Sequence, residues 1–333
     1  MVRVTRPHSS THGAVVCMIS RSTAFFILKL LVSASILAFL FSVIDVRVLY
    51  SHISDVSIFV FIAASLLYIV ATLIATLRWN VLLRSDGIRI PLQRLFAYSL
   101  SFNFYAVALP GGKIGAEAIR IYEAISDNPG ISREAIIVPT LVDRVATVFS
   151  SLVVAIIFFI VFPGVAVQFP WWIPYVGIGS IAIVIAMVVL PFERLFGIDK
   201  RVGVPMLQSV TPALTAFRKK SGTLVVTVAL SLIMNGAIAF AMYLFAVSLG
   251  ISVTYMLMFA LFSVGMVSTF IPISLAGIGV REGVVAYLLS IMAATSLEVG
   301  ASVTFLALAA SFSGVVAGAL VEFRRHFLIK RNP

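Results

Sequence analysis

Two clusters of charged side chains interrupt the first half of an otherwise apolar sequence. Lys113, Glu117 and Arg120 are spaced four and three residues apart, which places them on one face of a helix. Asp143 and Arg144 stand inside a long apolar stretch, where each charge costs about 3 kcal/mol on insertion scales. Arginine offers planar, permanently charged donors that suit a phosphate. These five residues are therefore candidates for lining the path of a charged headgroup.

A third charged pair, Arg281 and Glu282, follows a glycine-rich segment in the second half. Adjacent residues lie about 100° apart around a helix, so we expect each of the two to have a different partner. Arg144 and Arg281 are expected to pair a phosphate, while Glu117, Asp143 and Glu282 balance their charge or carry a proton. Two alternatives stay open. The charges could form a structural ion-pair network, or lie near an interface with their long side chains reaching water.

Proline and glycine interrupt the chain beside two of these clusters. Proline removes a backbone donor and glycine frees the backbone, so both stop a helix. Bare backbone at membrane depth is tolerated only within protein or beside a water-filled cavity, which we expect at both breaks. A second helix is expected to begin near Lys113 and to present its N-terminal amides to that cavity. The expected hinge residues are Pro110, Gly111, Gly112 and Gly115 in the first break, and Pro272, Gly277 and Gly279 in the second.

The composition indicates which kind of protein positions these residues. Of 333 residues, 61% are hydrophobic and 11% are charged. Water-soluble globular proteins are nearer half apolar and a quarter charged. The composition therefore excludes a soluble globular protein and predicts an all-α, polytopic integral membrane protein without a sizeable soluble domain.

Six stretches have the roughly 20 apolar residues that a membrane span needs. They are 23–44, 56–77, 134–162, 171–191, 222–248 and 299–321. Two further regions, Arg94–Ile125 and Thr254–Ser290, each contain an apolar segment, a break and a second short helix. Basic residues concentrate in the N-terminal tail, in 78–94, in 193–220 and after Val321, which places both termini in the cytoplasm under the positive-inside rule.

These spans form two similar sets, which predicts an inverted repeat of a kind common among transporters. Each membrane repeat, 23–162 and 171–321, has three spans plus one re-entrant or broken-helix hairpin. Whether the hairpins cross fully stays open. The remaining segments are a basic tail 1–22, an outside loop 163–170, a basic cytoplasmic loop 192–221 and a basic tail 322–333.

Polar and small residues also recur at helical spacing within three of the spans. Thr140, Asp143, Thr147 and Ser150 form a polar stripe; Thr227, Ser231 and Asn235 share a face, as do Ala310, Gly314 and Gly318. We expect the second and third sets to be helix-packing features, because small and polar residues mark helix contacts in membranes.

Several chemistries lack the residues that they need. The single cysteine, Cys17, excludes an intramolecular disulfide and a thiolate metal site. No paired-carboxylate metal motif and no phosphate-binding loop appears, so we expect no metal, no cofactor and no ATP motor. The histidines His8, His12, His52 and His326 lie in tails or a loop, which argues against an intramembrane general base. The net charge of +11 indicates loops that contact anionic lipids, not nucleic acid.

The motifs together resemble the lysylphosphatidylglycerol synthase transmembrane family, also called the flippase-like domain family, over about residues 20–325. The resemblance rests on Arg78-Trp79, Leu109-Pro110-Gly111-Gly112 with Gly115 and Arg120, Asp143-Arg144, and Pro272 with Gly277-Ile278-Gly279-Val280-Arg281-Glu282. It implies a polytopic domain that moves, or helps to move, a lipid or lipid-linked sugar between leaflets. Two-domain members attach lysine to phosphatidylglycerol with a C-terminal soluble domain, which is not expected here, so neither is lysyl transfer.

The leading hypothesis is a lipid or lipid-linked-sugar translocase of the inner membrane, with a headgroup path between the two repeats. Its expected partners are that lipid and anionic lipids at the cytoplasmic loops. An integral membrane enzyme, or an accessory subunit that binds other envelope-synthesis proteins, is the alternative. The resemblance links such members to glycolipid, polyprenyl-linked sugar or hopanoid pathways.

Overall fold

The computed structural model describes residues 51, 55–109, 112–166, 220–269 and 279–329, in which helices are joined by short turns and loops and no strand occurs. Its helices are α3 (Ile58–Ser85), α4 (Leu92–Ala108), α5 (Gly112–Ser126), α6 (Arg133–Val161), α7 (Pro163–Ala166), α11 (Ser221–Ser248), α12 (Tyr255–Ser268), α13 (Val280–Met292) and α14 (Leu297–Ile329). Four of them, α3, α6, α11 and α14, are long and apolar enough to cross a membrane. The all-α, polytopic prediction is therefore confirmed, while the predicted spans 23–44 and 171–191 lie outside the described residues.

Each predicted hairpin consists of two short helices packed on each other, α4 with α5 and α12 with α13. The second helix of the first hairpin begins at Gly112, as the sequence indicates near Lys113. Gly112 has a φ of 53° and Gly279, which precedes α13, a φ of 92°. Only glycine adopts this left-handed conformation without steric cost, so the two positions need it.

Of the remaining predicted hinge residues, only Gly115 is among the described residues. Gly115 lies within α5, where a Cβ would meet only Leu109 at ordinary contact distance. Pro110, Gly111, Pro272 and Gly277 lie outside the described residues.

The order long, short, short, long occurs twice along the chain, as α3 to α6 and as α11 to α14. The predicted repeat requires this order. The inverted orientation of the two sets and the domain boundaries stay predictions.

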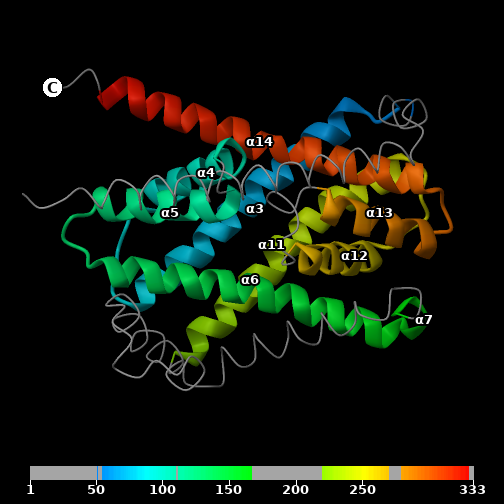
Figure 1. The fold of residues 1–333 in the computed structure, drawn as a ribbon, viewed down its shortest axis with the longest axis horizontal. Helices are drawn as coiled ribbons and strands as arrows, with labels where there is room; N and C mark the ends of the chain where they lie inside the picture. The colour runs from blue at the N-terminus through cyan, green and yellow to red at the C-terminus, as the bar shows by residue number, and fades with distance from the viewer. Residues whose placement is uncertain (1–50, 52–54, 110–111, 167–219, 270–278, 330–333) are drawn as a thin grey trace, which may run out of the picture.

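Helices of the two halves interlock. In Figure 1, α4 and α5 lie towards one end and α12 and α13 towards the other, with α3 and α11 running between them. The contacts across the halves include α3 on α11, α14 on α4, α14 on α3, α6 on α12 and α6 on α11. Gly318 lies so close to α4 that a Cβ there would come within 2.1 Å of the Leu100 carbonyl oxygen. The predicted packing role of Gly318 and its neighbours on the last span is consistent with this approach.

Two long helices extend past their predicted ends. The sequence places Arg78 after a span that ends at 77, whereas α3 continues to Ser85 and buries Arg78 and Trp79. Likewise, α14 continues beyond 321 and buries Glu322. A prediction from hydropathy ends a span at the first charged residue. A charged side chain that is paired inside the protein can nevertheless stay within the helix bundle.

Candidate functional site

Arg78 is the centre of a buried charged cluster among the long helices. Its side chain is 2% exposed, and its Nε lies 2.5 Å from Oδ1 of Asp143, which is 1% exposed. Its Nη1 donates to Ser231 Oγ at 2.9 Å. One guanidinium on α3 therefore contacts both α6 and α11.

Glu117 and Arg120 on α5 extend this cluster towards its accessible side. Arg120, 3% exposed, places Nη2 2.5 Å from Glu117 Oε1 and 3.7 Å from Asp143 Oδ2. Glu117 Oε2 accepts a hydrogen bond from Arg144 Nη2, and the Arg144 side chain is 39% exposed. The spacing of Glu117 and Arg120 predicted their common face correctly.

Aromatic rings cover the arginines of this cluster. The Arg120 guanidinium carbon lies 4.4 Å from the centre of the Trp79 ring, and that of Arg144 lies 4.7 Å from the Phe102 ring. Trp79 Nε1 in turn donates to Thr140 Oγ1 at 3.0 Å. Such cation–π contacts favour arginine over other side chains at these positions.

Three arginines share two carboxylates here, which leaves one positive charge. The cations are Arg78, Arg120 and Arg144, and the anions are Glu117 and Asp143. Arg120 Nε is buried and has no acceptor among the described residues. An unused buried donor beside an excess positive charge is the arrangement expected of an anion site.

The polar stripes on α6 and α11 meet beside this cluster. Asn235 Nδ2 donates to Ser151 Oγ at 3.0 Å and to Ser150 Oγ at 3.3 Å. Thr147 instead bonds to the Asp143 carbonyl oxygen of its own helix. The α11 face was predicted to pack helices, and it does so while also contributing Ser231 to the charged cluster.

The second break carries a compact charged pair. Arg281 Nη2 lies 2.5 Å from Glu282 Oε1, and Glu282 Oε2 accepts from the Gly279 N–H at 2.8 Å. The expectation that these neighbours have different partners is therefore wrong. The Glu282 side chain bends back to cap the start of α13. In this position its carboxylate also reaches the Arg281 guanidinium, although neighbouring side chains usually point apart on a helix.

Lys113 lies near charged residues of both sites. It is exposed, and it is within electrostatic reach of Arg144, Arg281 and Glu282. The space lined by Tyr68, Arg281 and Glu282 measures about 10 Å³, which is no more than one water molecule needs. The pair at the second break therefore has room for at most one water molecule. Arg144, at 39% exposed, is more accessible than Arg281, at 21% exposed.

These residues lie within a known family of membrane domains. The family model described as the lysylphosphatidylglycerol synthase TM region matches residues 26–319. The chain belongs to the lysylphosphatidylglycerol synthase transmembrane family. A comparison with curated proteins finds no match. Membership confirms the resemblance seen in the sequence and makes this a multi-pass membrane protein of lipid metabolism or translocation.

The family's sequence motifs contain two site residues that charge patterning missed. Arg78 and Trp79 belong to the motifs of the resemblance, but the positive-inside rule assigned them to a cytoplasmic loop. Asp143 has no cation one turn away on its own helix. Its charge was therefore a signal that a buried cation on another helix pairs with it.

Candidate metal ligands and histidines are the last residue types to be placed in the described ranges. These ranges contain no group of three or more His, Cys, Asp or Glu residues placed to hold a metal ion. His8, His12 and His52, like the side chain of His326, lie outside the described residues.

Proposed function

We propose that this chain moves the anionic headgroup of a lipid or lipid-linked sugar between the leaflets of the inner membrane. The observation that supports this most is the excess positive charge of the Arg78, Arg120 and Arg144 cluster over Glu117 and Asp143. A phosphate would complete that charge balance, and arginine binds phosphate through two parallel donors.

The exposures of the side chains suggest an order of contacts. Arg144, at 39% exposed, meets the headgroup first and exchanges Glu117 for the phosphate. Arg120, whose Nε lacks an acceptor, then offers a second donor deeper in the protein. Lys113 extends the positive surface towards Arg281. The acyl chains stay in the lipid throughout.

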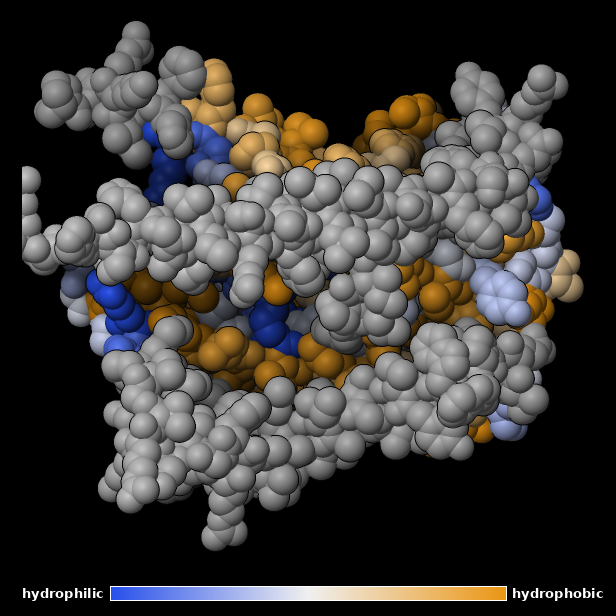
Figure 2. Space-filling view, in the orientation of Figure 1, coloured by the Kyte–Doolittle hydropathy of each residue, from blue (hydrophilic) through white to orange (hydrophobic). Residues whose placement is uncertain are grey.

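The surface supports a membrane setting for this movement. Figure 2 shows hydrophilic residues in the middle of one face of the described part, with hydrophobic residues around them. In this proposal both termini face the cytoplasm, and basic loops bind anionic lipids there. The proposal includes envelope-synthesis proteins as partners, and nucleic acid has no part in it.

The proposal is tested with the purified full-length protein in vesicles of phosphatidylcholine that contain a trace of labelled lipid in one leaflet. We expect labelled phosphatidylglycerol to change leaflets faster than labelled phosphatidylcholine, as followed by membrane-impermeant quenching. Equal rates for both labels, or rates no faster than in protein-free vesicles, would count against it.

A leaflet-resolved lipid inventory of cells with and without the gene then identifies the substrate. The proposal expects one lipid in the wrong leaflet at unchanged total amount. A missing modified lipid with its precursor accumulating would favour the enzyme alternative instead.

A further inference from the structure

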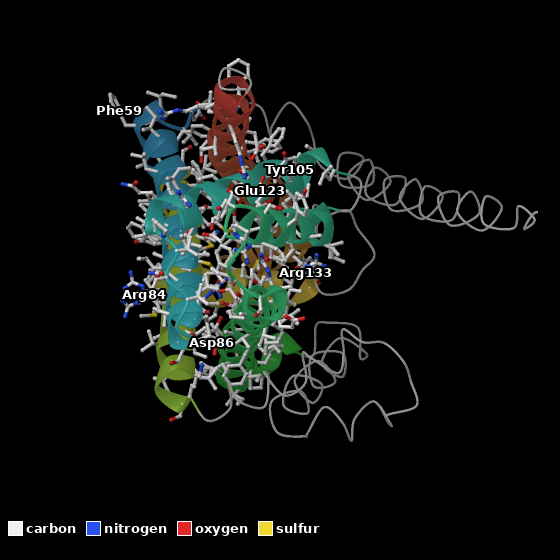
Figure 3. The ribbon with its side chains drawn as sticks, turned by 90° about the vertical axis from the view of Figure 1, so that its left-hand side faces the viewer. Phe59, Arg84, Asp86, Tyr105, Glu123 and Arg133 are labelled. Carbon is white, nitrogen blue, oxygen red and sulfur yellow. The ribbon has the colours of Figure 1, made fainter. Side chains whose placement is uncertain are left out.

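A second group of buried charges lies where α4, α5 and α14 meet, with contacts of its own. Glu123 on α5 and Glu322 on α14 are each 7% exposed. Arg325 follows Glu322 by three residues on α14 and contacts Glu123, so the two carboxyl groups lie near each other. In Figure 3, Glu123 and Tyr105 lie at the same level of the molecule, beside α14 in red. The proposed headgroup path uses neither carboxyl group.

Glu322 is held as an acceptor on both of its oxygens. Ser101 Oγ donates to Oε1 at 2.5 Å, and Tyr105 OH donates to Oε2 at 3.0 Å. Both oxygens of Glu322 therefore serve as acceptors for hydroxyl groups of α4.

Glu123 has one satisfied oxygen and one that lacks a donor. Its Oε1 lies 2.8 Å from Arg325 Nη1. Its Oε2 is buried and receives no hydrogen bond from any described residue. Two ionised carboxylates cannot hydrogen-bond to each other, because neither has a donor. A proton on Glu123 Oε2 supplies that donor and lets Glu123 donate to Glu322.

The surrounding charges leave this proton in place. Arg325 is shared, because its Nη2 also lies 2.7 Å from Asp127 Oδ2. Asp127 accepts a hydrogen bond from Tyr98 OH at 2.8 Å as well. Three acids thus lie near Arg325, which contacts Glu123 and Asp127 and follows Glu322 by three residues on α14. Burial and the negative charges nearby favour the protonated form of Glu123.

A cavity lies next to the pair, although neither glutamate lines it. It measures about 370 Å³, and its polar lining includes Arg94, Tyr98, Ser101, Asp127, Arg324 and Arg325. Ser101 and Arg325 line this cavity and also contact Glu322 and Glu123, respectively. A single side chain therefore separates water in the cavity from each carboxyl group. This side chain is Ser101 for Glu322 and Arg325 for Glu123. Arg94 and Arg324 are exposed on its wall.

We propose that Glu123 and Glu322 form a proton-binding carboxyl pair that exchanges one proton with this cavity. The proton rests on Glu123 Oε2 and is shared with Glu322. Its release to the cavity couples a proton gradient to lipid movement, a step that rests on the proposed function. One ionised and one protonated carboxyl group exist before release, and two carboxylates exist after it, so charge and protons balance.

Infrared difference spectroscopy tests the site itself. The full-length protein in phosphatidylcholine vesicles is titrated from neutral to alkaline pH. We expect a carboxylic acid C=O band that is present at neutral pH, disappears on alkalinisation and is missing from both Glu123→Gln and Glu322→Gln. Asp127→Asn is the matched control, because it shares Arg325 but should keep the band. A wild-type spectrum without the band, or a band that survives both glutamine variants, overturns the proposal.

Glu123→Gln keeps the test decisive if Glu322→Gln fails to fold. The glutamine oxygen still accepts from Arg325 and its amide donates to Glu322, so this variant imitates the protonated pair. Loss of the band in folded Glu123→Gln alone then supports the proposal, and its persistence overturns it.

Labelled phosphatidylglycerol vesicles with a proton gradient test the coupling. We expect the gradient to accelerate lipid movement severalfold in the wild type, and to have no effect in Glu123→Gln. Equal acceleration in the variant overturns the coupling. If the band is present but the wild type moves no lipid at any pH, the proposed function fails while the proton site stands. If lipid moves but the band is absent, only the proton site fails.

Discussion

Arg78 Nε and Asp143 Oδ1 lie 2.5 Å apart although 65 residues separate them in the sequence. Both side chains are almost completely buried, at 2% and 1% exposed. Because Arg78 also donates to Ser231, this one guanidinium links α3, α6 and α11. The structural-network interpretation therefore applies to Asp143, whereas the more exposed Arg144 next to it remains available for a ligand.

Removing Asp143 should destabilise the bundle. Asp143→Ala leaves Arg78 buried without its carboxylate, and loss of one partner of a buried pair typically costs about 3–5 kcal/mol. Asp143→Asn should cost less, because its amide oxygen can still accept from Nε. Denaturant unfolding in detergent micelles measures both, with the double variant Arg78→Leu/Asp143→Leu as control. A wild-type midpoint for Asp143→Ala would refute the stabilising role.

Arg144 should affect transport rather than stability. Because its side chain is 39% exposed, its pair with Glu117 contributes at most about 1 kcal/mol. We expect Arg144→Ala to slow phosphatidylglycerol movement at least about tenfold, since loss of one charge-assisted contact is worth about 1.5–3 kcal/mol. The matched control is Arg133→Ala, an exposed arginine at the start of the same helix. Similar rates in the two variants would remove Arg144 from the headgroup path.

The two residues of the second break should differ in their effects on folding. Glu282→Ala removes the cap of Gly279 and leaves Arg281 without its carboxylate, so it should lower folded yield strongly. Arg281→Ala should be milder, because Gly279 still donates to Glu282. Thermal unfolding monitored by size-exclusion chromatography measures both. A larger loss of stability in Arg281→Ala would show that the cap contributes little.

Gly318 should not tolerate a methyl group. A Cβ there would lie 2.1 Å from the Leu100 carbonyl oxygen, so α14 and α4 must separate. Gly318→Ala is expected to cost about 1–3 kcal/mol, as overpacking does. Gly222→Ala on α11 is the control, since nothing lies within 4 Å of its added Cβ. The expectation is wrong if the unfolding midpoints of the two variants shift equally.

Local patterns in the sequence predicted the helices and breaks well. Hydropathy located the four long spans of the described part, and the prolines and glycines marked both breaks to within a few residues. These signals are local, because a break depends on the residues at that point. The same holds for the common face of Glu117 and Arg120.

Contacts between distant segments were not predictable from those patterns. Arg78 has an ordinary position at the end of an apolar stretch, and only its approach to Asp143 shows that it is buried. Glu322 likewise appears in a basic tail, although it packs against Ser101 and Tyr105. Pairing of this kind depends on tertiary packing, which a single sequence does not contain. The same limit explains the wrong expectation for Arg281 and Glu282.

The contact of α14 with α4 also affects the order of folding. Chains fold from the N-terminus during synthesis, so the α4–α5 hairpin enters the membrane long before α14 exists. Until the ribosome finishes the last helix, the α4 backbone at Leu100 lacks its cover and Glu123 lacks Arg325 and Glu322. The carboxyl pair and its cavity are therefore assembled only after α14 has been synthesised, and a nascent chain that lacks α14 lacks them.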